Sequence, residues 1–169
     1  MIKKCAIACS LFLTACLGIP ENITPVQNFD INRYLGKWYE IARLDHSFEK
    51  GLEKVTAEYS FLDDDGVKVI NRGFSADDNE WKQADGKAYF VNSKTEGYLK
   101  VSFFGPFYGS YVIFELDENY QYAFVTGADK SYLWFLSRAP KVDDDLKNHF
   151  LETVNKLGYD TAELIFVKH

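Results

Sequence analysis

The residues that could do chemistry in this chain of 169 residues are few and widely spaced. The three histidines, His46, His149 and His169, lack the spacing of a metal site, and the chain has neither a Gly-x-Ser-x-Gly nucleophile motif nor a phosphate-binding loop. The Asp-Asp-Asp-Gly run at residues 63–66 lacks the alternating ligands and closing glutamate of a calcium loop. We therefore predict no catalytic residue, no metal site and no cofactor.

The amino-terminal cysteines indicate covalent lipid attachment instead. Two lysines near the start precede an uncharged, mostly apolar run over residues 5–15, which suits a signal peptide and is too short to span a bilayer. It ends in Leu-Thr-Ala-Cys at residues 13–16, which resembles the lipobox of bacterial lipoproteins. The resemblance implies cleavage before Cys16 and conversion of Cys16 to an N-palmitoyl, S-diacylglycerol cysteine. An ordinary cleaved signal that contains a cysteine is the alternative.

Charge limits the partners of the mature chain. Cleavage after residue 15 would remove two of the 19 basic residues and none of the 25 acidic ones, which moves the net charge from −6 to −8. An acidic domain is poorly suited to nucleic acid or to anionic lipid, so we predict no nucleic-acid partner and attachment to the membrane through the acyl chains. Because Leu17 is not the aspartate that signals retention at the inner membrane, we expect the periplasmic face of the outer membrane.

The pattern after the anchor is that of an all-β domain. We expect a signal peptide at 1–15, a lipidated tether at 16–28, which contains two prolines, and a barrel domain at 29–169. Apolar and polar residues alternate over 54–61, and 14 Phe and 11 Tyr favour strands. Strands are expected around Trp38 and at 54–61, 67–74, 85–91, 98–104, 111–116, 122–127 and 132–138, followed by a helix at 143–157 and a final strand at 162–168.

Eight strands, one late helix and a last strand, in this order, resemble the lipocalins, and specifically the bacterial outer-membrane lipocalins related to apolipoprotein D. The first family motif reads NFDINRYLGKWYEIAR, and the last reads YLWFLSRAP and ends the eighth strand with Arg138. The stretches DHSFEKGLEKVTAEYS, GKAYF and KVSFFGPFYG suggest the bacterial subgroup. The middle motif departs from the family at Leu116-Asp117-Glu118, and the disulfides of apolipoprotein D have no counterpart.

The resemblance implies an eight-stranded antiparallel up-and-down β-barrel that holds a lipophilic molecule. Gly36, Trp38 and Arg138 would form its floor, with the guanidinium stacked on the indole. A fatty acid or lysophospholipid would be held or carried for lipid storage or transport, in envelope maintenance or stress. The expected lining residues are Ala57, Tyr59, Val69, Asn71, Ala88, Phe90, Val101, Phe103, Tyr111, Ile113, Phe124, Tyr132 and Trp134.

Several alternatives stay open at this level. In the sixth strand both Tyr111 with Ile113 and Val112 with Phe114 are apolar enough to face inward. The FFGPFYG stretch at 103–109 could be a membrane-facing lip, a homodimer contact or a loop packed on the barrel. A periplasmic interaction scaffold and a lipocalin-like enzyme are the rival functions. A dry interior carboxylate with perturbed titration, such as Glu40 or Glu115, would favour the enzyme, and a barrel filled by its own side chains would favour the scaffold.

Overall fold

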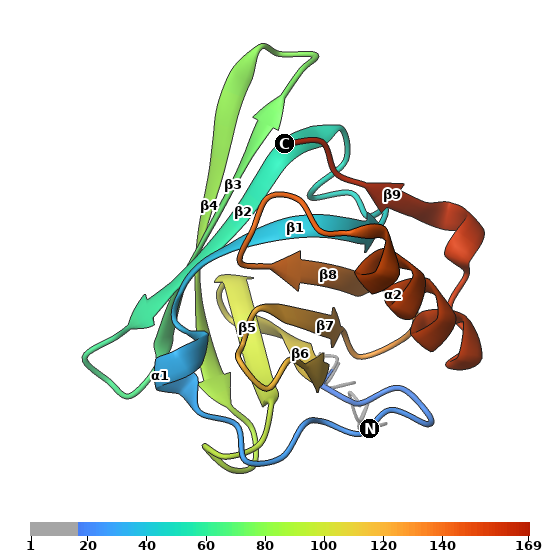
Figure 1. Cartoon of the computed structure of the whole chain (residues 1–169). Coiled ribbons are helices and arrows are strands. Elements are labelled where there is room, and N and C mark those ends of the chain that lie inside the picture. Colours follow the sequence, from blue (N-terminus) through green and yellow to red (C-terminus); the bar gives the residue numbers. More distant parts are fainter. Residues whose placement is uncertain (1–16) are drawn as a thin grey trace, which may run out of the picture.

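The computed structural model describes residues 17–169 as one closed antiparallel sheet with a helix on its outside (Figure 1). The predicted signal peptide and Cys16 lie outside the described residues. The elements, in chain order, are α1 (Ile31–Tyr34), β1 (Gly36–Leu44), β2 (Leu52–Phe61), β3 (Val67–Ser75), β4 (Glu80–Phe90), β5 (Tyr98–Phe104), β6 (Phe107–Leu116), β7 (Tyr122–Thr126), β8 (Leu133–Ser137), α2 (Asp144–Lys156), the 3₁₀ turn η1 (Thr161–Glu163) and β9 (Leu164–Phe166).

Pairing of the first strand with two neighbours closes the barrel. Strands β2 to β8 pair in chain order, and β1 pairs with both β2 and β8. Beyond Tyr39, β1 leaves β2, and β9 pairs with β1 in its place (Figure 1). The all-β prediction of an eight-stranded up-and-down barrel with a late helix and a short last strand is therefore confirmed.

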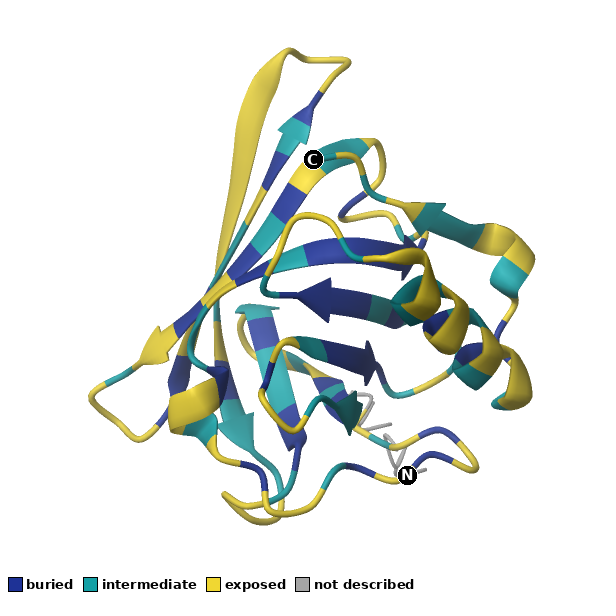
Figure 2. Ribbon diagram, viewed as in Figure 1, coloured by how far each residue is buried: buried dark blue, intermediate teal, exposed yellow. Residues whose placement is uncertain are grey.

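Two apolar clusters hold the fold together. The interior cluster lines the inside of the barrel, and its buried members are Phe29, Tyr34, Trp38, Ala57, Tyr59, Val67, Val69, Ala88, Leu99, Ile113, Tyr120, Ala123, Val125 and Leu136. The helix-side cluster lies between the barrel wall and α2, and its buried members are Ile23, Ile41, Ala42, Leu44, Tyr98, Val112, Phe124, Leu133, Phe135, Phe150, Val154 and Tyr159. Because β1, β7 and β8 serve both clusters, they are buried along most of their length, whereas much of the β3–β4 hairpin is exposed (Figure 2).

Helix α2 forms where its sequence supplies a cap and one apolar stripe. The Asp143 carboxylate accepts a hydrogen bond from the Leu146 backbone N–H at 2.8 Å, and two further aspartates occupy the first turn. Phe150 and Val154, four residues apart, are buried on the same face. The helix therefore packs on the outside of the barrel through this stripe. Neither helix within residues 17–169 combines the length and apolarity needed to cross a membrane.

The segment predicted as a tether lies against the barrel over its second half. The Val26 N–H donates to the Ile113 carbonyl at 2.9 Å, and the Gly97 N–H donates to the Val26 carbonyl at 2.8 Å. Ile23 is buried, and Val26 packs on the interior cluster. Two prolines prevent a regular helix or strand here, but they do not prevent backbone pairing at the flanking residues.

Smaller differences concern element boundaries. The short helix α1 was not expected, and β4 begins at Glu80 rather than at residue 85. The aromatic stretch at 103–109 is not a separate loop, because β6 begins at Phe107 and pairs with Phe104 around a cis Gly105–Pro106 bond. It forms the tip of the β5–β6 hairpin.

Candidate ligand-binding interior

An arginine and a tryptophan close one end of the barrel. The Arg138 guanidinium carbon lies 3.9 Å from the centre of a Trp38 ring, and the Trp38 indole N–H donates to the Tyr34 carbonyl at 2.8 Å. Arg138 also donates to backbone carbonyls in and beside α1, including Lys37 at 2.9 Å and Leu35 at 3.0 Å. Gly36 has a φ of +91°, which a residue with a side chain rarely adopts. The three predicted floor residues thus lie together, at the end where α1 covers the barrel (Figure 1).

Three tyrosines form a polar layer next to this floor. The Tyr111 hydroxyl lies 2.7 Å from the Tyr34 hydroxyl and 2.8 Å from the Tyr59 hydroxyl. The Tyr34 ring centre is 4.8 Å from that of Trp38 and 5.4 Å from that of Tyr59. Burial raises the pKa of all three phenols, so each stays protonated and can donate as well as accept. The layer satisfies its own polar atoms and leaves the rings to line the interior.

Most of the predicted lining residues face the same interior. Ala57, Tyr59, Val69, Ala88, Phe90, Val101, Phe103, Tyr111, Ile113 and Trp134 all belong to or pack on the interior cluster. Phe90, Val101, Phe103, Tyr111 and Trp134 are partly exposed although they face inward. Side chains that face inward yet keep accessible surface border space that the atoms of the protein leave unfilled, so these residues mark apolar space inside the barrel. Gly86 leaves room for Phe103, since a Cβ at Gly86 would lie 2.8 Å from that ring.

The ambiguity of the sixth strand is resolved by the two clusters. Tyr111 and Ile113 face the interior, and Val112 and Phe114 pack in the helix-side cluster.

Phe124 was predicted in the pocket, and this prediction is wrong. Its ring centre lies 4.9 Å from that of Phe150 on α2 and 5.1 Å from that of Phe135, in the helix-side cluster. Its neighbours Ala123 and Val125 face the interior instead. All three residues are apolar, so the alternation does not distinguish the faces. Phe124, the largest of the three side chains, fills the space between the barrel wall and α2.

Tyr132 and Asn71 were also predicted to line the pocket, and the structure places them in different parts of the barrel. Tyr132 precedes β8, and its ring centre lies 6.0 Å from that of Trp134 and 5.7 Å from that of His46, at the open end. Asn71 follows Val69 by two residues on β3, so it shares the inward face of that residue. Its Oδ1 is buried without a hydrogen-bond donor among the described residues. This free acceptor in the wall could bind a donor of a ligand.

A buried charged group lies near the open end, and of its members the sequence named only Glu40, as an interior carboxylate that would favour an enzyme. Arg43 is only 1% exposed, and its Nη1 donates to the Glu40 carboxylate at 2.7 Å. Its Nη2 donates to the Glu49 carbonyl at 2.8 Å, and the Trp134 indole N–H donates to the Glu49 carboxylate at 3.1 Å. Burial, reinforced by the neighbouring Glu49, raises the pKa of Glu40 against the opposing effect of Arg43. Burial also raises the pKa of Glu49. Both terminal nitrogens of Arg43 are therefore committed to internal partners, whereas its Nε is buried without a partner among the described residues.

His46 adds a neutral imidazole to this group. Its Nε2 lies 3.1 Å from the Glu49 carboxylate, yet neither ring nitrogen makes a hydrogen bond with acceptable geometry within residues 17–169. Burial, with a smaller contribution from Arg43, lowers its pKa to about 4. The ring is thus neutral at pH 7, so the contact with Glu49 is not an ion pair. The His46 ring stacks on the Phe48 ring, with ring centres 3.9 Å apart.

A bulge in β1 explains why Arg43 escaped prediction. The pairing of β1 with β8 skips a residue between Glu40 and Ala42, so the inward face runs from Trp38 and Glu40 to Arg43. A regular alternation would place Arg43 on the opposite face from Glu40. The spacing of Glu40 and Arg43 could have indicated the bulge. An acid and a base three residues apart in a regular strand point to opposite faces, so the two can form an ion pair inside the barrel only if a bulge lies between them.

Comparisons with known proteins agree with this geometry. The outer membrane lipoprotein Blc of Vibrio cholerae is 60% identical over 163 residues, covering 96% of this chain and 95% of that protein. The protein of the same name from Escherichia coli K12 is 52% identical over 149 residues, covering 88% and 84%. These relatives confirm the predicted lipid-anchored localisation at the outer membrane.

Solved structures and a family model identify the fold and the family. Insecticyanin of the tobacco hornworm Manduca sexta superposes with a TM-score of 0.70 at 18% identity, covering 90% of this chain and 87% of that one, which shows the shared fold. The model of the lipocalin-like domain matches residues 29–169. With a floor of Trp38 and Arg138 beneath an open apolar interior, the chain belongs to the lipocalin-like family.

Proposed function

We propose that the barrel holds one single-chain lipid, with its acyl chain inside and its head group at the open end. The observation that carries this proposal is the set of inward side chains that remain partly exposed above the closed floor, among them Phe90, Val101, Phe103 and Trp134. Burying about 16 methylenes at ~0.8 kcal/mol each gives at most roughly 13 kcal/mol. Association costs of about 4 kcal/mol or more leave room for micromolar or tighter binding.

The polar atoms near this interior favour a lysophospholipid over a fatty acid. Glu40 and Glu49 are acceptors when ionised, the Asn71 Oδ1 lacks a donor, and the neutral His46 ring has one acceptor nitrogen. The buried cation, Arg43, already serves Glu40. A lysophospholipid can offer a hydroxyl donor and, in some classes, an ammonium group. A fatty-acid carboxylate would find the Arg43 Nε–H and the neutral His46 N–H as unpaired donors, but it would also lie near the Glu40 and Glu49 carboxylates.

The protein would act at the periplasmic face of the outer membrane, anchored through Cys16. There it would store or transport single-chain lipids that arise during envelope maintenance or stress. The substitution Cys16→Ala should release the chain from membranes, and a variant that remained membrane-bound would contradict the anchor.

Native mass spectrometry of the mature protein, purified from its own host membranes, tests the ligand. We expect a co-purifying lysophospholipid, and after its removal tighter binding of added lysophospholipid than of a fatty acid with the same chain. Phe103→Ser should weaken binding about tenfold or more, because it removes apolar lining. Phe61→Ser is the matched control, since Phe61 is 55% exposed at the end of β2 beside the closed floor. A delipidated barrel that binds neither lipid would overturn the proposal.

The buried Glu40 is the observation that favours an enzyme as the second candidate. Its raised pKa is the perturbed titration that such a function requires. However, the carboxylate accepts from Arg43, and the side-chain hydrogen bonds of the described residues join this group to Trp134 and not to a serine or cysteine nucleophile. Release of free fatty acid from bound lysophospholipid, abolished by Glu40→Gln, would establish the enzyme, and intact ligand after prolonged incubation would exclude this reaction.

A further inference from the structure

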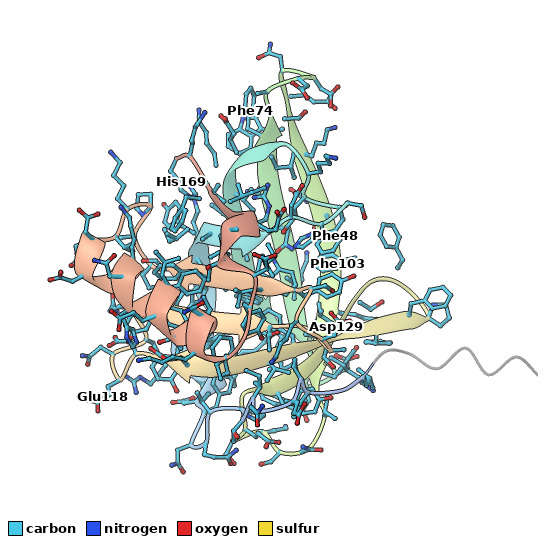
Figure 3. All side chains as sticks on the ribbon, turned by 90° about the vertical axis from the view of Figure 1, so that its right-hand side faces the viewer. Phe48, Phe74, Phe103, Glu118, Asp129 and His169 are labelled. Atoms are coloured by element: carbon cyan, nitrogen blue, oxygen red, sulfur yellow. The ribbon has the colours of Figure 1, made fainter. Side chains whose placement is uncertain are left out.

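Exposed aromatic side chains gather at the open end of the barrel. Phe48, in the loop between β1 and β2, is 56% exposed. At the tip of the β5–β6 hairpin, Phe104 is 80% exposed and Phe107 is 56% exposed. We call these three residues the mouth aromatics. In Figure 3 Phe48 lies on the same side of the molecule as Phe103, which lines the interior, and Asp129, in the loop between β7 and β8.

The amino-terminal end of the described chain lies at the same end of the barrel. The Gly18 N–H donates to the Ser110 hydroxyl at 2.8 Å. A Cβ built on Gly18 would lie 3.7 Å from the carbonyl oxygen of Ala128, in the loop between β7 and β8. Ser110 is three residues from Phe107 on β6, which is about 10 Å along a strand.

The position of Gly18 limits where a lipid anchor can be. Cys16 is two residues away, and two residues span at most about 7 Å. Acyl chains on Cys16 would therefore leave the protein within roughly 25 Å of the β5–β6 hairpin tip. The anchor cannot reach a membrane that faces α1 at the closed end without detaching Gly18 from the wall.

We propose that the open end of the barrel faces the leaflet that holds the anchor, with the mouth aromatics inserted among its lipid head groups. Phenylalanine side chains of membrane-bound segments insert at the boundary between the head groups and the acyl chains. The nearby loops carry both signs of charge, with Asp45 and Asp129 beside Lys50 and Lys130, so insertion should depend on apolar contact rather than on anionic lipid. A lipid could then pass between leaflet and barrel without crossing water. The proposal rests on lipidation of Cys16 and not on the identity of the ligand.

Depth-dependent quenching of tryptophan fluorescence tests this orientation. The lipidated mature protein would be reconstituted in vesicles of phosphatidylethanolamine and phosphatidylcholine that carry brominated acyl chains, which quench nearby tryptophans. One variant carries Phe104→Trp, and the matched control carries Phe61→Trp, because Phe61 is 55% exposed at the opposite end of the barrel. We expect the emission added by Phe104→Trp to shift to the blue and fall at least twofold, and that added by Phe61→Trp to change little.

Three outcomes would overturn the proposal. Equal quenching in both variants would indicate a barrel without fixed orientation, and absence of quenching in Phe104→Trp would indicate a mouth turned away from the membrane. The third outcome combines a blue shift without quenching and a dimer in native mass spectrometry that Phe104→Ser abolishes. It would show that the mouth aromatics contact a second copy of the chain. The vesicles contain no single-chain lipid, so the quenching result is independent of whether the barrel binds a lysophospholipid.

Discussion

The two ends of the barrel each use a buried or half-buried arginine, and they use it in opposite ways. At the closed end, Arg138 lies over Trp38, and its partners within residues 17–169 are all backbone carbonyls. Near the open end, Arg43 is enclosed in the interior and is paired with the Glu40 carboxylate. One arginine thus joins segments of chain distant in sequence, and the other neutralises a charge that would otherwise be costly inside the barrel.

The difference extends to the polar atoms around each arginine. At the closed end, the hydroxyls of Tyr34, Tyr59 and Tyr111 satisfy one another. Near the open end, the Arg43 Nε and both His46 ring nitrogens have no hydrogen-bond partner among the described residues. A complete network specifies a rigid floor, whereas an incomplete one leaves groups that a ligand or water can satisfy. The comparison assigns stability to the closed end and recognition to the open end.

The largest expected effect comes from breaking the ion pair. Arg43→Met should lower the free energy of unfolding by about 3 to 5 kcal/mol at pH 8, because it leaves Glu40 buried without its counter-charge. The loss should be smaller at pH 5. Because the pKa of Glu40 is raised, its neutral form is favoured at pH 5 and needs no counter-charge. The stability that this neutral form contributes is lost as the pH rises through the folded-state pKa of Glu40.

Urea unfolding at both pH values measures this effect. Addition of Glu40→Gln to Arg43→Met should restore most of the stability, since it removes the unpaired charge. If the double variant were no more stable than Arg43→Met, the charge pair would not be the cause.

At the closed end, Arg138→Ala should cost about 2 to 3 kcal/mol, from the lost stacking on Trp38 and the lost hydrogen bonds to carbonyls. In a chain of this size that corresponds to a fall in melting temperature of about 5 to 10 °C, measurable by circular dichroism. Lipid affinity should stay unchanged at a temperature where the variant is folded. An unaltered melting temperature would refute the structural role, and a selective loss of lipid affinity would remove the contrast between the two ends.

A smaller loss is expected within the tyrosine layer. Tyr111→Phe removes the one hydroxyl that contacts both Tyr34 and Tyr59, so two buried hydroxyls lose their partner. We expect a loss of about 1 to 2 kcal/mol in urea unfolding. The control is Tyr108→Phe, on the same strand but outside this layer. Equal effects of the two substitutions would show that the layer does not stabilise the floor.

The smallest effect should appear only as a change with pH. The His46 pKa of about 4 in the folded state lies below the ordinary value of 6.5. Its neutral form therefore contributes stability above pH 6.5, and this contribution is lost as the pH falls from about 6.5 to about 4. His46→Phe keeps the stacking on Phe48 but removes the titration.

Melting temperatures of the two proteins between pH 7.5 and 4 provide the measurement. The wild-type value should fall relative to that of His46→Phe over this window, while Asp45, Glu49 and Arg43 remain in both proteins. Parallel curves would show that His46 is accessible to protons in the folded state, as an exposed imidazole would be.

The sequence predicted the strand order, the late helix and the residues of the floor, because each depends on local signals. Alternation identifies strands, Asp143 and the stripe through Phe150 identify α2, and the family motifs carry Trp38 and Arg138. None of these requires knowledge of how the strands align with one another.

The failures that concern the site depend on how the strands align with one another. The bulge in β1 reverses the inward face after Glu40, so Arg43 was missed. On β7, three consecutive apolar residues hide the face of Phe124. The docking of residues 23–28 depends on backbone hydrogen bonds such as that of Val26 to Ile113, which no side-chain pattern records. A single sequence therefore indicates which residues form strands more reliably than which side of the wall they face.

The last strand has a consequence for the behaviour of the protein in a crowded compartment. Where β1 leaves β2, residues 42–44 of β1 would present unpaired backbone groups on one of the most apolar strands of the barrel. Strand β9 covers these groups, and the Lys54 N–H donates to the Lys168 carbonyl at 2.7 Å beside it. Such an edge, if bare, is a template for pairing with another chain. The final residues therefore protect the barrel from aggregation, and a chain shortened before Leu164 should be more prone to form insoluble assemblies than to lose its lipid.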